Sequence, residues 1–307
     1  MAGAGEAPSG RQVELSHGDQ RATVVEVGGG VRTYDVGGRP VLHGYAEDEM
    51  CDAARGQVLI PWPNRVAGGA YHFAGRHLQL ALTQPEQGNA IHGLTRWANW
   101  TLEQPGPSVA AASHLLHPQP GYPFTLACRV EHRLGEDGLT TRIGVTNVGA
   151  DPAPVGFGCH PYLTVGTPTI DTAVLRLPAA TRLVTDGRGI PVGREPVAGS
   201  PWDFREPRVI GDVRLDTALT GLRRDADGRF RVRLAAPEGP TTLTVWADGA
   251  FAWVQVFSGD GLGEQARRSL AVEPMTCAPD AFNNGEGLRV VGPGESLVGT
   301  WGIGVGG

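Results

Sequence analysis

Glycine and proline interrupt this chain so often that a helix-rich fold is improbable. The 307 residues include 46 glycines and 24 prolines, and both residue types destabilise the interior of a helix while fitting naturally between short strands. Bulky and polar side chains alternate at residues 139–145, 230–234 and 241–247, the pattern of strands with one face in water. The best helical candidate, residues 264–270, is short and charged. Helix is therefore expected to stay below about 15%.

Further strands are predicted at residues 22–27, 31–36 and 40–42, where glycine pairs mark the turns. Residues 251–257 (FAWVQVF) are apolar on both alternations apart from Gln255, which predicts a central strand covered on both faces. No repeat or linker divides the interior. We therefore predict an all-β chain with a single large antiparallel β-sandwich at residues 12–307, after a small, polar, disordered tail at residues 1–11.

Charge and cysteine spacing exclude several classes of function. The net charge is -6, and the arginines form no basic block, so binding to nucleic acid is not expected. The widely spaced Cys51, Cys128, Cys159 and Cys277 contain no C-x-x-C pair and read as reduced residues of a cytoplasmic protein. The N-terminus lacks an export signal, and no run reaches the roughly 18 apolar residues of a membrane span. Neither export nor membrane insertion is expected.

A metal site is not expected either, although the chain has nine histidines. The only close pair is His114 and His117, and two residues three apart on a strand face opposite sides. Pro118 argues against a helix that would bring them together. No cofactor is expected.

The stretch at residues 61–93 contains two polar groups held by stiff backbone. Pro61 and Pro63 restrict the turn that precedes Asn64 and Arg65, and His92 is followed directly by a glycine. Taken alone, Arg65 is more readily explained by a surface ion pair with a carboxylate, and His92 by a structural role in a loop. Two further residues share this design, because His160 and Glu273 each end an apolar or glycine-broken run and precede a proline. Asp216 follows another apolar step.

At these residues the chain resembles the aldose 1-epimerase family, the galactose mutarotases. The resemblance runs from about residue 22 to residue 303. It is carried by PWPNRVAGGAYHFAGRHLQL and NAIHGL, by HPQPGYPF at residues 117–124, by GFGCHPYL, and by AVEPMTCAPDAFNNGEGL with the closing PGES. The resemblance implies a large twisted antiparallel β-sandwich, the galactose mutarotase-like supersandwich.

The resemblance also implies roles for individual residues. Glu273, before Pro-Met, corresponds to the general base, and His160, before Pro-Tyr, to the general acid. Arg65 and His92 correspond to residues that hold the sugar, with Asn64 beside them. Asp216 corresponds to a binding aspartate, although many members have Asp-His where this chain has Asp216-Thr217. We expect Arg65, His92, His160 and Glu273 to line one pocket, and an aromatic such as Trp62, Trp97 or Phe282 to stack on the sugar.

Interconversion of α and β anomers requires one base and one acid, placed on opposite sides of the bond between C1 and the ring oxygen. A carboxylate desolvated by apolar neighbours and an imidazole both titrate near neutrality, so Glu273 and His160 suit this chemistry. The implied substrate is a free aldohexose such as galactose or glucose.

Three alternatives remain open at this point. The first is a non-catalytic carbohydrate-binding protein on the same fold. The second is an epimerase of hexose 6-phosphates, for which the sequence shows no additional cationic cluster. The third is a glycoside-cleaving enzyme, which would need two carboxylates flanking the bond. The matched site has one, with Asp216 as the only further candidate.

Overall fold

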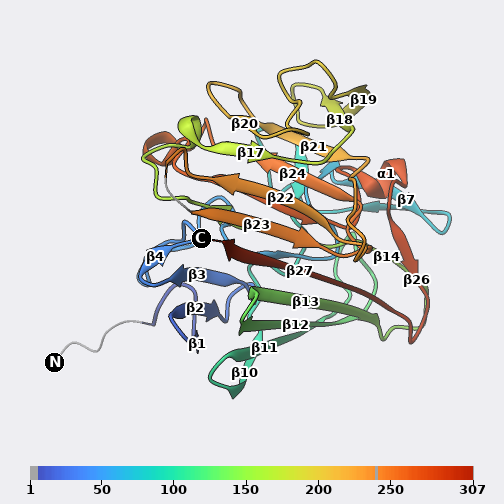
Figure 1. Ribbon diagram of the computed structural model, residues 1–307. Coiled ribbons are helices and arrows are strands. Elements are labelled where there is room, and N and C mark those ends of the chain that lie inside the picture. Colours follow the sequence, from blue (N-terminus) through green and yellow to red (C-terminus); the bar gives the residue numbers. More distant parts are fainter. Residues whose placement is uncertain (1–5, 239–240, 307) are drawn as a thin grey trace.

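The computed structural model describes residues 6–238 and 241–306 (Figure 1). Strands account for 47% of the chain and helices for 3%, which confirms the predicted all-β fold and its low helix content. The helical segments of the described residues are α1 (Ala281–Asn284) and two 3-10 turns, η1 (Ile170–Thr172) and η2 (Gly263–Gln265). The expected helical candidate at residues 264–270 therefore forms only one short turn before a strand begins at Leu270.

The larger of the two main sheets has nine antiparallel strands within the described residues. In order across the sheet they are β10 (Thr101–Gly106), β11 (Val109–Leu116), β12 (Leu126–Gly135), β13 (Gly138–Asn147), β27 (Ser296–Gly306), β23 (Thr242–Ala247), β22 (Phe230–Ala235), β17 (Val174–Arg176) and β20 (Arg208–Val209). Buried and more exposed side chains alternate along β12, as the period-two pattern of its neighbours predicts.

The second sheet holds the buried strand that the sequence predicted. Its order is β19 (Pro191–Pro196), β18 (Thr181–Thr185), β21 (Asp216–Thr220), β24 (Trp253–Phe257), β25 (Leu270–Met275), β15 (Gly158–Cys159) and β5 (Val58–Leu59), and β16 (Tyr162–Leu163) also pairs with β25. The central position predicted for residues 251–257 is confirmed, since β24 lies between β21 and β25. The strand begins at Trp253 because the Phe251 N–H is bonded to the Asp248 carbonyl in a turn.

Smaller sheets complete the described part of the fold. They are a four-stranded sheet of β1 (Gln12–His17), β2 (Gln20–Val25), β3 (Val31–Val36) and β4 (Arg39–Pro40), and the pairs β6 (Arg65–Ala67) with β9 (Asn89–Ile91), β7 (Ala70–Phe73) with β8 (Arg76–Gln79), and β14 (Ala153–Val155) with β26 (Arg289–Val291). Figure 1 shows the four-stranded sheet, in blue, beside the green strands β11 to β13, and β1 and β2 contact β12.

Part of the expected N-terminal tail packs against the protein. Residues 1–5 of that prediction lie outside the described residues. Ser9 is buried, its hydroxyl bonds to Tyr45 at 3.1 Å, and its carbonyl accepts the Val27 N–H. The segment just before β1 is therefore held by hydrogen bonds that its small, polar composition did not reveal.

One apolar cluster joins the two main sheets. It contains Ile143 and Ile303 from the nine-stranded sheet and Val256 and Val272 from the other, all 1% exposed or less. Because burial of apolar surface is the main stabilising contribution to folding, this shared core fixes β24 and β25 against the sheet behind them. Polar groups carried by β21 and β25 are thus held on a rigid support.

Candidate active site

A cavity of about 290 Å³ brings together all six residues that the sequence singled out. They are Asn64, Arg65, His92, His160, Asp216 and Glu273. The first three lie on or directly beside the paired strands β6 and β9, and the others belong to strands or strand ends of the second sheet. Residues that are distant in sequence therefore face one space.

Arg65 and His92 are placed by the pairing of β6 with β9, in which Arg65 is opposite Ile91. The Arg65 Nε donates a hydrogen bond to Gln84 at 2.9 Å. Its guanidinium also lies against the backbone of Gly189, where a built Cβ atom would be 2.8 Å from the Arg65 Cζ. The glycine thus lets the loop between β18 and β19 lie directly on this arginine.

His92 is held in a left-handed backbone conformation, with φ of 63°. Its Nδ1 accepts the Asn64 N–H at 3.2 Å, and its own N–H donates to the Asn64 carbonyl at 2.9 Å. Gly93 must follow, because a Cβ at that position would lie 2.1 Å from the Ile60 carbonyl oxygen. The His-Gly motif therefore reflects a close backbone contact that fixes the imidazole, with Nε2 left to face the cavity.

His160 and Glu273 are brought together by neighbouring strands. His160 follows β15, which pairs with β25, and Glu273 lies within β25 opposite Gln255 of β24. The sequence placed Glu273 at the end of an extended run, but β25 continues through Pro274 to Met275. Proline has a φ compatible with extended backbone, so it did not end the strand.

The two side chains touch inside the protein. His160 Nε2 lies 3.3 Å from Glu273 Oε1, with side chains only 6% and 2% exposed. His160 Nδ1 and Glu273 Oε2 are buried and have no hydrogen-bond partner among the described residues. The His92 ring meets the His160 ring edge to face at 5.3 Å. Buried polar atoms usually have partners, so these unsatisfied atoms indicate a site prepared for a polar ligand.

Burial shifts both groups towards their neutral forms. It raises the pKa of Glu273 well above its usual value, with a further rise from Asp216 and an opposing effect of Arg65. Burial lowers the pKa of His160 to about 3, a change assisted by Arg55 and Arg96 and opposed by the residue's own backbone. At neutral pH both groups are therefore neutral, and the pair holds a single titratable proton, on Glu273.

Asp216 is the first residue of β21 and lines the cavity. Its side chain can be reached from the cavity, although protein surrounds it on the other sides. Burial raises its pKa, and Arg65 and a hydrogen bond from Gln255 oppose that rise. Gln255 Nε2 donates to Asp216 Oδ1 at 2.6 Å. This contact orients the carboxylate and leaves its second oxygen for a ligand hydroxyl.

Sequence reasoning missed several lining residues, among them Gln84, Arg96 and Tyr162. Gln255 was visible as the single polar side chain of an apolar strand, which is a signal that could have identified it. Arg96 follows the His-Gly motif by only a few residues, but nothing in the sequence showed that its side chain turns back to the cavity. The guanidinium of Arg96 has no hydrogen bond or ion pair within the described residues.

The aromatic side chains expected to stack on a sugar lie elsewhere. Trp62 and Phe282 are buried and pack on each other at 5.3 Å. Trp97 is 48% exposed and contacts Arg96, but it does not line the cavity. Tyr162 and Phe257 are the aromatic lining residues instead. The error arose because a motif's aromatic residues serve packing as readily as binding.

Within residues 6–238 and 241–306, no group of three or more His, Cys, Asp or Glu side chains is arranged to hold a metal ion. His114, of the only close histidine pair, has its Nδ1 3.0 Å from the Asn99 carbonyl oxygen. In the same described residues, no helix is long and apolar enough to cross a membrane.

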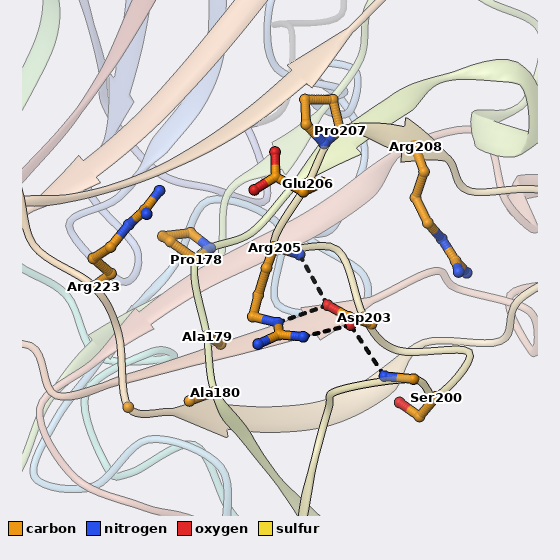
Figure 2. A pocket seen from close by; sticks show the side chains of 12 residues that line it. Pro178, Ala179, Ala180, Ser200, Asp203, Arg205, Glu206, Pro207, Arg208 and Arg223 are labelled. Carbon is orange, nitrogen blue, oxygen red and sulfur yellow. Dashed lines mark hydrogen bonds and ion pairs between the residues drawn. The ribbon is translucent and has the colours of Figure 1, made fainter.

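A second, larger hollow of about 760 Å³ lies where β18 begins and β21 ends (Figure 2). Asp203 and Arg205 form a bidentate ion pair there, with contacts of 2.8 and 2.7 Å. Arg208 donates to the Pro201 carbonyl and packs on Phe204. Asp203 and Arg205 are thus engaged with each other, Arg208 is engaged with a carbonyl and an aromatic ring, and the described lining includes no histidine.

Comparison with known proteins agrees with this geometry. A sequence model of the aldose 1-epimerase family matches residues 11–303. The chain belongs to the aldose 1-epimerase family. It is 34% identical to the protein YihR of Escherichia coli K12 over 288 residues, 94% of this chain and 91% of that protein. It is 28% identical to a maltose epimerase of Levilactobacillus brevis over 286 residues, 85% and 81% of the two chains.

Solved structures share the fold at lower identity. The galactose 1-epimerase of Lactobacillus acidophilus NCFM superposes with a TM-score of 0.81 at 18% identity, covering 96% of this chain and 95% of that one. The GalM/aldose epimerase homologue of C. elegans gives a TM-score of 0.85 at 18% identity, with 96% and 98% covered. These similarities identify the galactose mutarotase-like fold.

Proposed function

We propose that this protein is an aldose 1-epimerase that interconverts the α and β anomers of a free aldohexose such as galactose or glucose. The observation that carries the proposal is the buried contact of 3.3 Å between His160 and Glu273, in a cavity that Arg65, His92 and Asp216 also line. A carboxylate and an imidazole side by side supply the one base and one acid that ring opening needs. The cavity volume of about 290 Å³ suits a single sugar ring.

In the proposed reaction Glu273 removes the proton of the anomeric hydroxyl. The electrons of that O–H bond form the carbonyl at C1, the bond from C1 to the ring oxygen breaks, and the ring oxygen takes a proton from His160. Rotation about the C1–C2 bond turns the other face of the carbonyl to the ring hydroxyl. The same two groups then reverse the proton transfers, so no proton is gained or lost overall.

The proton balance of the free site is consistent with this cycle. Burial favours neutral Glu273 and neutral His160, a pair with one proton. Moving that proton to His160 produces the carboxylate and imidazolium that the first step uses. A bound sugar favours this form, because its anomeric hydroxyl donates to the carboxylate and its ring oxygen accepts from the imidazolium.

The remaining cavity residues are proposed to hold the hydroxyls. Arg65 and His92 have donors available, and Asp216 is oriented as an acceptor by Gln255. Asn64 is proposed to contribute mainly by fixing His92, since their backbones are hydrogen-bonded to each other. We further propose a reducing, cytoplasmic setting, because all four cysteines are buried and free.

Polarimetry tests the proposal directly. Freshly dissolved α-D-galactose and α-D-glucose should reach their equilibrium rotation faster in proportion to protein concentration. If a panel of aldoses that includes maltose shows no acceleration, the enzymatic proposal fails. Calorimetry with the same sugars then tests the alternative of a non-catalytic carbohydrate-binding protein.

One observation favours a second candidate, an epimerase of hexose 6-phosphates. Arg96 lines the cavity, and its guanidinium has no ion-pair partner among the described residues. A half-buried, unpaired cation is a natural partner for an anionic substituent. Comparison of kcat/KM for glucose and glucose 6-phosphate, in the parent and in Arg96→Met, distinguishes the two substrates. A preference for the phosphate that disappears in the variant would support this candidate.

A further inference from the structure

The imidazole of His160 is the end of a stack of three side chains. Its ring lies nearly parallel to that of Tyr162, at 12° with the centroids 4.9 Å apart. The Arg55 Cζ lies over the same tyrosine ring, 4.6 Å from the centroid. The Tyr162 hydroxyl donates to the Ala53 carbonyl at 3.0 Å, which fixes the ring in its plane.

Arg55 is a buried cation whose charge is only partly compensated. Its side chain is 3% exposed, and its Nε donates to Asp52 Oδ1 at 2.7 Å, while the Asp52 side chain is 55% exposed. The Arg55 Nη1 lies 3.5 Å from His43 Nδ1, and Nη2 has no partner among the described residues. Solvent screens the exposed carboxylate more than the buried guanidinium, so the field of Arg55 persists inside the protein.

The backbone that carries Arg55 is joined to the backbone of His160. The Gly56 N–H donates to the His160 carbonyl at 2.9 Å, and the His160 N–H donates to the Gln57 carbonyl at 3.2 Å. The distance between the guanidinium and the imidazole is therefore fixed by both main chain and stacking. A displacement of Arg55 would therefore also displace the backbone or the ring of His160.

We propose that Arg55 and Tyr162 are positioning residues for His160: Tyr162 holds the plane of the imidazole, and Arg55 opposes the arrival of a second proton on the His160–Glu273 pair. This inference rests on the proposed acid–base function. The other charged or titratable groups that face His160 are Glu273, His92 and Arg96, with Asp216 beyond Glu273 and Asp52 beyond Arg55.

The stack has a chemical purpose in this proposal. A pair with one proton can act as base and acid together, whereas a pair with two protons has lost its base. A nearby cation disfavours the doubly protonated, positively charged form, in line with the lowering effect of Arg55 on the pKa of His160. Arg55 thereby keeps the pair active into mildly acidic solution.

The test is the pH dependence of kcat in two variants with opposite expectations. Arg55→Met removes the cation and keeps an apolar side chain over Tyr162. The fall of kcat on the acidic side of its pH profile, the acid limb, should therefore move to higher pH by on the order of one unit. Asp52→Asn removes the compensating carboxylate at an exposed position and should move the acid limb to lower pH. Tyr162→Leu should lower kcat at every pH, whereas Tyr162→Phe should keep the acid limb of the parent.

A purely structural role for Arg55 would lower the melting temperature and leave the acid limb in place. An unmoved limb in folded Arg55→Met therefore overturns the proposal. If that variant does not fold, an unmoved limb in Asp52→Asn overturns it instead. NMR titration of the His160 imidazole without sugar separates this inference from the proposed function. A higher His160 pKa in Arg55→Met supports the inference whatever the substrate, and an unchanged pKa overturns it.

Discussion

His160 Nε2 and Glu273 Oε1 lie 3.3 Å apart with almost no exposure to solvent. An exposed pair at this distance would be a weak surface ion pair, but burial makes full charge separation costly. The contact is therefore better described as a protonated, neutral Glu273 next to a neutral imidazole, with one proton between them that can be moved. A sugar that supplies hydroxyl donors and a ring-oxygen acceptor would redistribute that proton without changing the net charge of the site.

The first prediction concerns the base. Glu273→Gln keeps the shape of the side chain but cannot accept the anomeric proton, so kcat should fall by on the order of 100-fold or more with sugar affinity little changed. Optical rotation of fresh α-anomers measures the rate. Glu264→Gln, at an exposed residue within η2, is the matched control and should behave as the parent. Near-parental rates in Glu273→Gln on every accepted aldose would show that the base is another group.

The second prediction concerns the pair as a unit. His160→Asn should lower kcat to an extent similar to Glu273→Gln, because each proton transfer needs its counterpart. The double variant should then be scarcely slower than either single variant. Rates that multiply in the double variant would instead indicate two independent contributions.

The third prediction separates binding from chemistry. Arg65→Ala should raise KM as well as lower kcat, since a charge-assisted hydrogen bond to a sugar hydroxyl is present in the ground state. Arg65→Lys keeps the charge but not the planar fork and should fall between parent and alanine. An unchanged KM in Arg65→Ala would remove this residue from the binding role.

The fourth prediction concerns stability against pH. The folded-state pKa of Glu273 is raised from its ordinary 4.5, so the stability that it contributes is present below that value and is lost as pH rises towards the folded pKa. Glu273→Gln lacks this loss. The free energy of unfolding of the variant, minus that of the parent, should therefore increase by up to about 1.4 kcal/mol per pH unit above pH ~4.5. Urea unfolding from pH 5 to pH 8 measures the difference, and parallel curves would contradict it.

The fifth prediction concerns the His-Gly turn. Gly93→Ala combines a φ of 70° with a contact of 2.1 Å between the new Cβ and the Ile60 oxygen, and should destabilise the fold by on the order of 3 kcal/mol or more. Gly68→Ala has a similar φ of 62° but nothing within 4 Å, so it should cost only about 1–2 kcal/mol. Thermal unfolding compares them. Equal losses would mean that the Ile60 contact can relax.

The fold class could be predicted from the sequence because it follows from local patterns of residues. Glycine and proline content excluded long helices, and period-two patterns marked strands such as β13 and β23 close to their observed bounds. The apolar run around Gln255 correctly predicted a central strand, since only a strand covered on both faces can lack a polar side. Which strands join which sheet depends on contacts between distant segments, and the local patterns did not contain that information.

The site shows the same division. Arg65, His92, His160 and Glu273 could be identified because each stands in a motif shared with the aldose 1-epimerase family, close to a proline or a glycine. Arg96 and Tyr162 could not, since only the folded chain shows that their side chains turn towards the cavity. The aromatic predictions were wrong for a related reason: Trp62 lies in the same motif as Arg65, yet its ring completes the core.

The placement of the cavity residues on or directly after β6, β9, β15, β21 and β25 has a consequence for refolding. No single hairpin contains both the acid and the base, and His160 reaches Glu273 only when β15 has paired with β25. Catalytic activity should therefore return late after dilution from denaturant, behind recovery of far-UV circular dichroism. Mutarotation would serve as a reporter of complete assembly, registering chains in which every long-range strand pairing around the cavity has formed.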